Sequence, residues 1–132
     1  MRIFIDTSAL YALLDGGDTN HAKVKRAWGE IIQPENTVVT SNYVLVETFA
    51  LVQSRLGLEA VRGFEEDLVP ILHVEFVTSA IHRLGVAALL SASRRGLSLV
   101  DCISFEIMRD LGIKTAFTFD AHFKEQGFEV VP

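Results

Sequence analysis

The chain has 132 residues, the size of a single domain, since domains commonly hold roughly 100–200 residues. Hydrophobic residues make up 49% and charged residues 22%, so the chain can bury a core without a disulfide or a structural zinc ion. The only cysteine, Cys102, excludes an intramolecular disulfide and a cysteine-based zinc site, and we expect a cytoplasmic protein. The net charge of −5 argues against a simple electrostatic binder of nucleic acid.

The sequence contains no segment typical of a signal peptide or of a membrane span. The first residues, Met1–Asp6, form too short an apolar run for a signal peptide, and an acid interrupts that run. No stretch reaches the roughly 18 apolar residues that a membrane span needs. The sequence also has no internal repeat, linker or low-complexity segment, so we expect one domain over residues 1–132.

Short apolar segments alternate with segments of helical spacing along the chain. The apolar segments predict strands at residues 2–6, 37–40, 73–77, 115–119 and 128–131. Helical spacing, caps and stop signals predict helices at residues 8–14, 20–33, 43–56, 58–68, 79–95 and 99–111, with Gly96 as the C-cap of the fifth. This alternation implies crossovers between parallel strands, hence an α/β fold with helices on both faces of the sheet. In such sheets ligands bind at the carboxyl ends of the strands.

Two aspartates follow predicted strands directly. Asp6 comes after the run Ile3–Ile5, and Asp120 comes after Thr115–Phe119. Both carboxylates are therefore expected at the carboxyl edge of the sheet. The alternative is that each is a helix N-cap, because aspartate is common where a strand leads into a helix.

Two further acids interrupt apolar helices. Glu47 lies in the run Tyr43–Val52, and a helix this apolar around its circumference is expected to be buried on most sides. A buried carboxylate there needs a partner, unless Glu47 occupies a narrow solvent-facing stripe. Asp101 lies three residues after Ser98, so it can close a capping box instead of serving a site. Ser104, three residues after Asp101 on the same face, is a candidate to orient the Asp101 carboxylate or a bound water.

If Asp6, Glu47, Asp101 and Asp120 converge, their mutual repulsion is unfavourable unless a cation is present. Oxygen ligands without a thiolate or imidazole cluster select hard ions, here Mg²⁺ or Mn²⁺. A divalent ion among carboxylates suits phosphodiester hydrolysis, because it lowers the pKa of water and offsets the developing charge. The four acids are therefore candidates for both catalysis and metal binding.

Three motifs resemble those of PIN-domain ribonucleases. They are Phe4–Leu10 at the start, Leu99–Phe105, and Thr118–Phe123 near the end, with Glu47 between them in the family's order. The resemblance covers essentially the whole chain, and its length is similar to that of VapC-like toxins of toxin–antitoxin pairs.

The resemblance implies a three-layer α/β/α sandwich with a central, mostly parallel sheet of about five short strands. It also implies an endoribonuclease dependent on Mg²⁺ or Mn²⁺, a homodimer, and an antitoxin that blocks the acidic pocket. Asp6, Glu47, Asp101 and Asp120 match the family's acidic quartet. Thr7 or Ser8, together with Thr118, match hydroxyl positions that support it.

RNA also needs positive charge, because phosphate contacts dominate affinity. Setting the quartet aside leaves 13 acidic residues against 12 basic ones. The candidate contacts with RNA are Lys23, Lys25, Arg26, Arg94 and Arg95. The alternatives are a solvated helix face for the first three and, for Arg94 and Arg95, a helix C-terminus interacting with its dipole.

Two other functions use clustered acids. A receiver-like signalling module accepts a phosphoryl group beside Mg²⁺, but it needs a lysine at a late strand end, where this chain has Phe119 and Asp120. A small-molecule phosphohydrolase with an aspartate nucleophile needs a second aspartate where this chain has Ser8. The four histidines are scattered, and none lies at metal-ligand spacing from another. For His122, near Asp120, we expect a surface role, and the alternative is a contact with a phosphate. The phenylalanines are expected in the core, and an exposed one would suggest a dimer or antitoxin surface.

Overall fold

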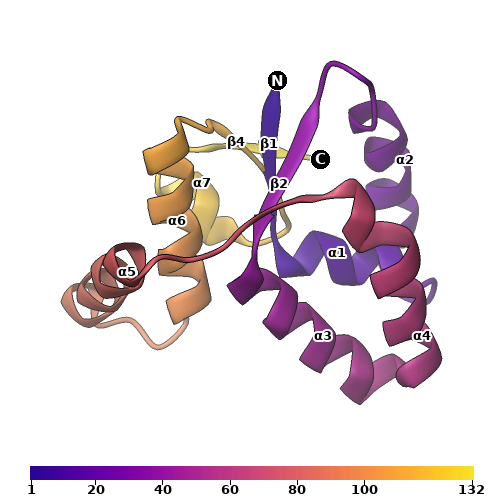
Figure 1. Ribbon diagram of the computed structural model, residues 1–132, viewed down its shortest axis with the longest axis horizontal. Helices are drawn as coiled ribbons and strands as arrows, with labels where there is room; N and C mark the ends of the chain where they lie inside the picture. Colours follow the sequence, from indigo (N-terminus) through magenta and orange to yellow (C-terminus); the bar gives the residue numbers. More distant parts are fainter.

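The computed structural model describes residues 1–132, and its centre is a parallel sheet of five strands (Figure 1). The strands are β1 (Arg2–Ile5), β2 (Thr37–Ser41), β3 (His73–Glu75), β4 (Thr115–Phe117) and β5 (Glu129–Val131). They lie in the order β3-β2-β1-β4-β5, and every neighbouring pair is parallel. The predicted parallel sheet of five short strands is therefore confirmed.

Seven α-helices surround the sheet. They are α1 (Thr7–Leu14), α2 (His21–Ile31), α3 (Asn42–Leu56), α4 (Leu58–Gly63), α5 (Ser79–Ala92), α6 (Leu99–Leu111) and α7 (Ala121–Glu125). A π-helical turn (Phe64–Leu68) and a 3-10 turn (Val69–Ile71) continue from α4. In Figure 1, α5, α6 and α7 lie to the left of the central strands, and α1, α2 and α4 lie to the right, which gives the predicted three layers. None of these helices is both long enough and apolar enough to cross a bilayer.

The strand order places β1 at the middle of the sheet. The chain builds outward from β1 through β2 to β3, then returns to the other side of β1 with β4 and β5. The order therefore reverses at β1, and its carboxyl end, shared with β4, is the point where α/β sheets form their ligand crevices. The backbone N–H of Asp6 donates to the carbonyl of Phe117 over 3.1 Å, which holds this edge together. A flavodoxin-like module has the order 2-1-3-4-5 instead, so the topology disfavours the receiver alternative.

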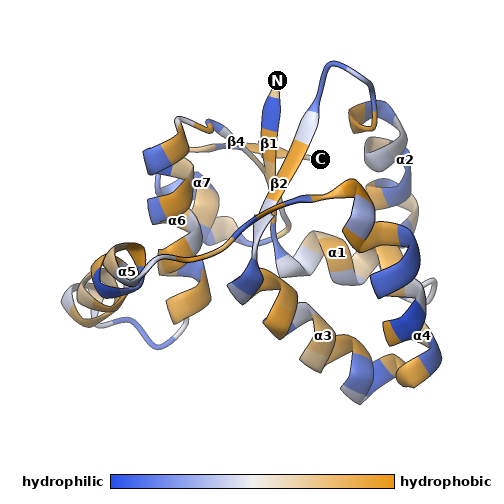
Figure 2. Ribbon diagram, viewed as in Figure 1, coloured by the Kyte–Doolittle hydropathy of each residue, from blue (hydrophilic) through white to orange (hydrophobic).

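The central strands are apolar without alternation because both of their faces are covered. Phe4 and Ile5 in β1 and Phe117 in β4 have no exposed surface. Figure 2 shows hydrophobic residues over β1 and β2, between the two layers of helices. From α6, the side chains of Ile103 and Met108 complete this core. Burial of these side chains fixes where the carboxyl edge of the sheet lies.

Several predicted boundaries are wrong. Strand β4 ends at Phe117, so Asp120 does not follow it directly, and the short helix α7 was not predicted. Helix α5 ends at Ala92, where Ser93 takes the left-handed conformation with φ 54°, so Gly96 is not the C-cap. The predicted helix 58–68 is divided, because the helical hydrogen-bonding pattern changes at Phe64.

Helix α3 is less buried than its composition predicts. Only Val44, Thr48 and Val52 are buried, and the side chain of Val46 is 68% exposed. Phe76, between β3 and α5, is 74% exposed, so the expectation of a phenylalanine in the core fails there. These residues leave apolar surface unpaired within one copy of the chain.

The packing of α5 on α6 depends on the absence of a side chain at Gly85. A Cβ at this position would lie 2.3 Å from Cδ1 and 2.9 Å from Cγ1 of Ile103, which is fully buried. We expect Gly85→Ala to lower the free energy of unfolding by about 1–3 kcal/mol, because overpacking forces buried side chains from their preferred rotamers. Urea denaturation followed by circular dichroism measures the change.

Gly63→Ala is the matched control. Gly63 has right-handed helical angles and nothing within 4 Å of its Cβ position, so alanine should be neutral or stabilise the fold by up to about 1 kcal/mol. An equal effect of the two substitutions would contradict the packing argument.

Candidate active site

Asp6 lies at the junction between β1 and α1 and is only 4% exposed. The hydroxyl groups of Ser8 and Thr118 lie 3.3 Å and 3.2 Å from its Oδ2. Burial raises the pKa of Asp6 from its ordinary value of 3.8 to about 7, and the negative charges of Asp101, Glu47 and Asp120 add to the effect. The sequence alternative of a side-chain N-cap does not apply, because this carboxylate makes no capping hydrogen bond.

Asp101 lies in the first turn of α6, and the capping-box interpretation is correct. Its backbone N–H donates to Ser98 Oγ over 3.0 Å, and its Oδ2 accepts from the Ser98 N–H over 3.1 Å. Its Oδ1 accepts no hydrogen bond, so the cap leaves one oxygen free for the cavity. Burial raises the pKa of Asp101, and Asp120 adds to this, while the bonds from Ser98 oppose it.

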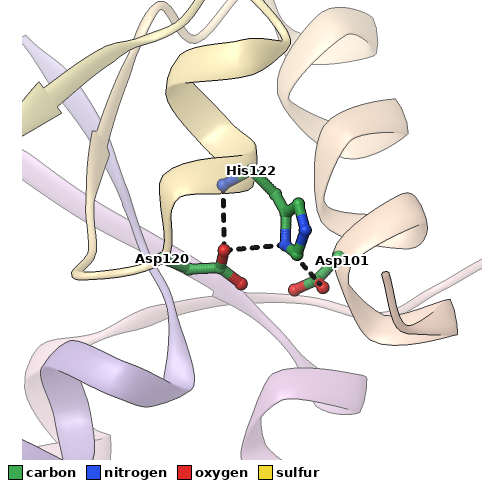
Figure 3. Close-up of side chains that lie close together, drawn as sticks. All are labelled: Asp101, Asp120 and His122. Atoms are coloured by element: carbon green, nitrogen blue, oxygen red, sulfur yellow. Dashed lines mark hydrogen bonds and ion pairs between the residues drawn. The ribbon is translucent and has the colours of Figure 1, made fainter. Parts of the chain in front are cut away.

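Asp120 caps α7, as the alternative interpretation of the sequence proposed. Its Oδ1 accepts from the N–H of His122 over 2.9 Å, and its own N–H donates to Thr118 Oγ1 over the same distance. The His122 ring lies between two of the acids (Figure 3), with Nδ1 2.8 Å from Asp120 Oδ1 and 3.8 Å from Asp101 Oδ2. The sequence reading placed His122 at the surface, but only 18% of its side chain is exposed.

Glu47, on α3, is half-buried and makes no hydrogen bond or ion pair. The Glu47 side chain is therefore not fully buried, and it does not pair with a basic side chain. Together with the three aspartates it lines a cavity of about 610 Å³ at the carboxyl edge of the sheet. The cavity is lined by Asp6, Thr7, Ser8, Glu47, Ala50, Leu51, Ser54, Ser98, Asp101 and Asp120. The structure therefore brings the four predicted acids to one place.

The predicted supporting hydroxyls divide into two groups. Ser8 and Thr118 lie 3.1 Å from each other and beside Asp6, so they order its carboxylate. Thr7 points instead to α3, where its hydroxyl lies 3.5 Å from the carbonyl of Val44. Ser104 donates to the carbonyl of Val100 over 2.8 Å, so the expectation that it orients Asp101 is wrong.

The predicted basic residues lie in two different places. Lys23, Lys25 and Arg26 are exposed on α2. Arg94 and Arg95 lie in the loop after α5, not in its last turn, so the helix-dipole interpretation is wrong for them. Arg94 Nη1 pairs with Glu125 Oε2 over 2.9 Å, so the charge of that guanidinium is already partly compensated.

The cavity fits a divalent cation. No lysine or arginine pairs with any of the four carboxylates. Burial and then like charges raise the pKa of Asp6 and of Asp101, so the negative charges in the cavity are not compensated by these side chains. The Nδ1 atom of His122 is buried without a hydrogen-bond partner, beside two carboxylates. Ligand atoms of Asp101, Asp120 and His122 lie within 4.8 Å of one another. The carboxylate oxygens suit Mg²⁺ and Mn²⁺, and the imidazole nitrogen is a ligand type that transition ions accept more readily than Mg²⁺ does.

The fold and the cavity define an α/β domain with an acidic pocket at the reversal point of its sheet. The family model described as "PIN domain" matches residues 3–129. The chain is 39% identical to the 23S rRNA-specific endonuclease VapC20 of Mycobacterium tuberculosis, and the match covers 98% of each chain. The chain therefore belongs to the PIN domain family, a family of nucleases, and it is an enzyme of this class.

Solved structures agree with this assignment. The crystal structure of M. tuberculosis VapC20, a sarcin–ricin loop cleaving toxin, matches with a TM-score of 0.88 at 38% identity, over 98% of this chain and 99% of that one. FitAcB from Neisseria gonorrhoeae gives 0.71 at 16% identity, covering 98% and 96% of the two chains. VapBC2 from Rickettsia felis, bound to a DNA fragment from its promoter, gives 0.73 at 14% identity, covering 98% and 97%. The last two share the fold.

The raised pKa of Asp6 should make the stability of the metal-free protein depend on pH. Because the folded state binds the Asp6 proton more tightly than the unfolded state, stability is lost as pH rises from about 4 to about 7. Asp6→Asn removes the charge, so at pH 8 in EDTA we expect it to raise the free energy of unfolding by roughly 1–3 kcal/mol. At pH 4 the variant and the wild type should melt together.

Excess Mg²⁺ should reverse the order at pH 8, because the wild type offers the ion one more carboxylate than the variant and therefore gains more stability from binding it. Asp110→Asn is the control, since Asp110 is exposed on α6 and has no ion pair. A loss of stability for Asp6→Asn in EDTA at pH 8 would show that the Asp6 charge is compensated within the protein.

Proposed function

We propose that this chain is an endoribonuclease dependent on Mg²⁺ or Mn²⁺ that hydrolyses phosphodiester bonds of RNA. The observation that carries the proposal is the meeting of Asp6, Glu47, Asp101 and Asp120 in one cavity without a lysine or arginine partner. We assign the metal ligands to these four acids. Bound among them, the ion would lower the pKa of a water molecule and offset the charge that develops on the phosphate.

The residues of the chain would divide the remaining work. Asp6 and Asp101 are held by hydroxyl and backbone donors, so their free oxygens are fixed before substrate binds. Asp120 is fixed in the same way by the N–H of His122. Glu47 has no partner and faces the same cavity from α3, so its carboxylate is free to accept a proton from the attacking water.

We infer that the substrate is structured ribosomal RNA. The support is the 39% identity over 98% of the chain with VapC20, whose name specifies 23S rRNA and whose structure is that of a sarcin–ricin loop cleaving toxin. The acidic cavity needs a basic rim for such a substrate. Lys23, Lys25, Arg26 and Arg95 are exposed and make no ion pair within the chain, so they are the candidates for phosphate contacts.

We further propose that the chain is the toxin of a toxin–antitoxin pair and acts in the cytoplasm, where ribosomes are found. Its likeness to VapC20, a toxin, supports this role. An antitoxin would inhibit it by covering the acidic cavity. The strand order and the family membership both favour this function over a receiver-like module, and Ser8, bonded beside Asp6, stands where an aspartate-nucleophile phosphohydrolase needs its second aspartate.

We also propose a homodimer through α5. This helix buries only Gly85, and its outer side carries Ala80, Leu84, Ala87 and Leu90, all exposed at helical spacing. Leu84 is 53% and Leu90 is 73% exposed, which is costly in water for two leucines on one face. A second copy of the chain would cover this stripe.

Removal of one metal ligand tests the nuclease activity. Asp101→Asn keeps an oxygen that can accept from the Ser98 N–H, so α6 should remain capped. We expect it to slow Mg²⁺-dependent cleavage of 23S rRNA in ribosomes by at least about 100-fold, because even outer-shell changes at metal sites cost 10–100-fold. Mapping of the RNA ends by primer extension gives both the rate and the cleavage position.

Asp110→Asn, the same substitution on the exposed part of the same helix, should cleave at the wild-type rate. Equal activity of Asp101→Asn and wild type would remove Asp101 from the mechanism. Metal-dependent cleavage confined to another RNA would overturn the substrate but leave the nuclease activity standing.

The dimer is tested by placing a charge on the stripe. Leu84→Lys should convert a dimer of about twice 14.6 kDa into a monomer, because burying an unpaired ammonium at an interface is unfavourable. Light scattering after size-exclusion chromatography gives the mass. Leu58→Lys, at a leucine of α4 that is 68% exposed, should leave the dimer intact. A monomeric wild type at tens of micromolar would contradict the proposal.

A further inference from the structure

The imidazole of His122 is the one feature of the acidic cavity that hydrogen bonding does not explain. Its Nδ1 is the only buried side-chain nitrogen or oxygen in the chain without a hydrogen-bond partner. Yet it lies 2.8 Å from Asp120 Oδ1 and 3.8 Å from Asp101 Oδ2 (Figure 3). Both oxygens already accept backbone N–H groups, of His122 and of Ser98.

A metal ion is a partner that these three atoms can share, because each of the two oxygens keeps a second lone pair beside the N–H that it accepts. In the tautomer with its proton on Nε2, Nδ1 presents a lone pair beside two carboxylates without hydrogen-bond geometry to either, which is unfavourable until a positive charge is placed between them. An octahedral ion with bonds of about 2.1 Å holds neighbouring donors about 3 Å apart and opposite donors about 4.2 Å apart. The separations of 2.8 Å and 3.8 Å from Nδ1 fall close to these values, and all three ligand atoms lie within 4.8 Å.

The loop after α5 passes beside the His122 ring. A Cβ at Gly96 would lie 3.9 Å from Cε1 and 4.0 Å from Nε2 of His122, which is an ordinary van der Waals distance. The same loop is joined to α7 by the pairing of Arg94 with Glu125 over 2.9 Å. An ion pair therefore connects this loop to the helix that carries the ring.

We propose that His122 Nδ1 is itself a ligand of the divalent ion, beside Asp101 and Asp120, and that this nitrogen makes the centre prefer Mn²⁺ to Mg²⁺. The inference rests on the proposed function to the extent that the cavity must bind a divalent ion. Mg²⁺ takes oxygen ligands and keeps its waters. Imidazole suits the later transition ions best, and Mn²⁺, the first ion of that series, also suits carboxylates, so it can use both kinds of ligand. The nitrogen thus adds affinity for Mn²⁺ that it does not add for Mg²⁺.

Pulsed electron paramagnetic resonance of the protein loaded with Mn²⁺ tests the bond directly, without an activity measurement. The wild type should show the ¹⁴N coupling of a coordinated imidazole, and labelling of the histidines with ¹⁵N should convert it to a ¹⁵N coupling. In His122→Gln the coupling should be lost. His73→Gln, which changes an exposed histidine of β3 bonded to Glu75, should retain it.

Competition between the ions tests the preference. The ratio of the dissociation constant for Mg²⁺ to that for Mn²⁺, measured by calorimetry, should fall by about 10-fold or more in His122→Gln, because a ligand and not an outer-shell group is lost. An unchanged ratio, or Mn²⁺ bound by the wild type without nitrogen coupling, would overturn the role of His122 while leaving the metal-dependent nuclease in place. If the wild type binds no Mn²⁺ at all, the metal dependence in the proposed function fails with it.

Discussion

Repulsion among four carboxylates is the constraint on which the site depends. The sheet reverses its strand order at β1, and the elements around that edge each bring one acid to the same cavity. Burial and like charge raise the pKa of Asp6 to about 7, and they raise the pKa of Asp101. The protein supplies no lysine or arginine to relieve this cost, so the fold maintains an unfavourable charge cluster that a divalent cation would stabilise.

The apolar core holds these acids in place despite their repulsion. The buried side chains of Phe4, Ile5 and Phe117 hold β1 and β4 side by side. The hydrogen bond from the Asp6 N–H to the Phe117 carbonyl then fixes the backbone of Asp6 at the edge of the cavity. Ser8 and Thr118, from opposite ends of the chain, then meet beside the Asp6 carboxylate. Asp101 and Asp120 each cap a helix with one carboxylate oxygen and also line the cavity, so capping and site roles coexist in one residue.

The apolar runs of the sequence predict the parallel sheet with helices on both faces, and they place Asp6 and Asp120 near its carboxyl edge. That Glu47 and Asp101 meet them was a hypothesis, since both lie in helices and only the family resemblance implied the quartet. The sequence does not predict α7, since five residues carry too little periodicity, nor the end of β4 at Phe117. It overestimates the burial of α3, because composition cannot show that Val46 faces away from the core. The prediction for His122 was wrong because it considered only the spacing between histidines. His122 lies two residues after Asp120, and its backbone N–H donates to the Asp120 carboxylate. The short spacing between these two residues was the feature of the sequence that could have indicated a shared site.

If the acidic cavity is a divalent metal centre, crystals of the protein grown with Mn²⁺ should reveal the ion by anomalous diffraction recorded near the manganese absorption edge. We expect an anomalous peak within bonding distance of carboxylate oxygens of Asp101 and Asp120, in the cavity that Asp6 and Glu47 also line. A fully ordered cavity without a peak, or with the four carboxylates bonded only to water and protein donors, would contradict it.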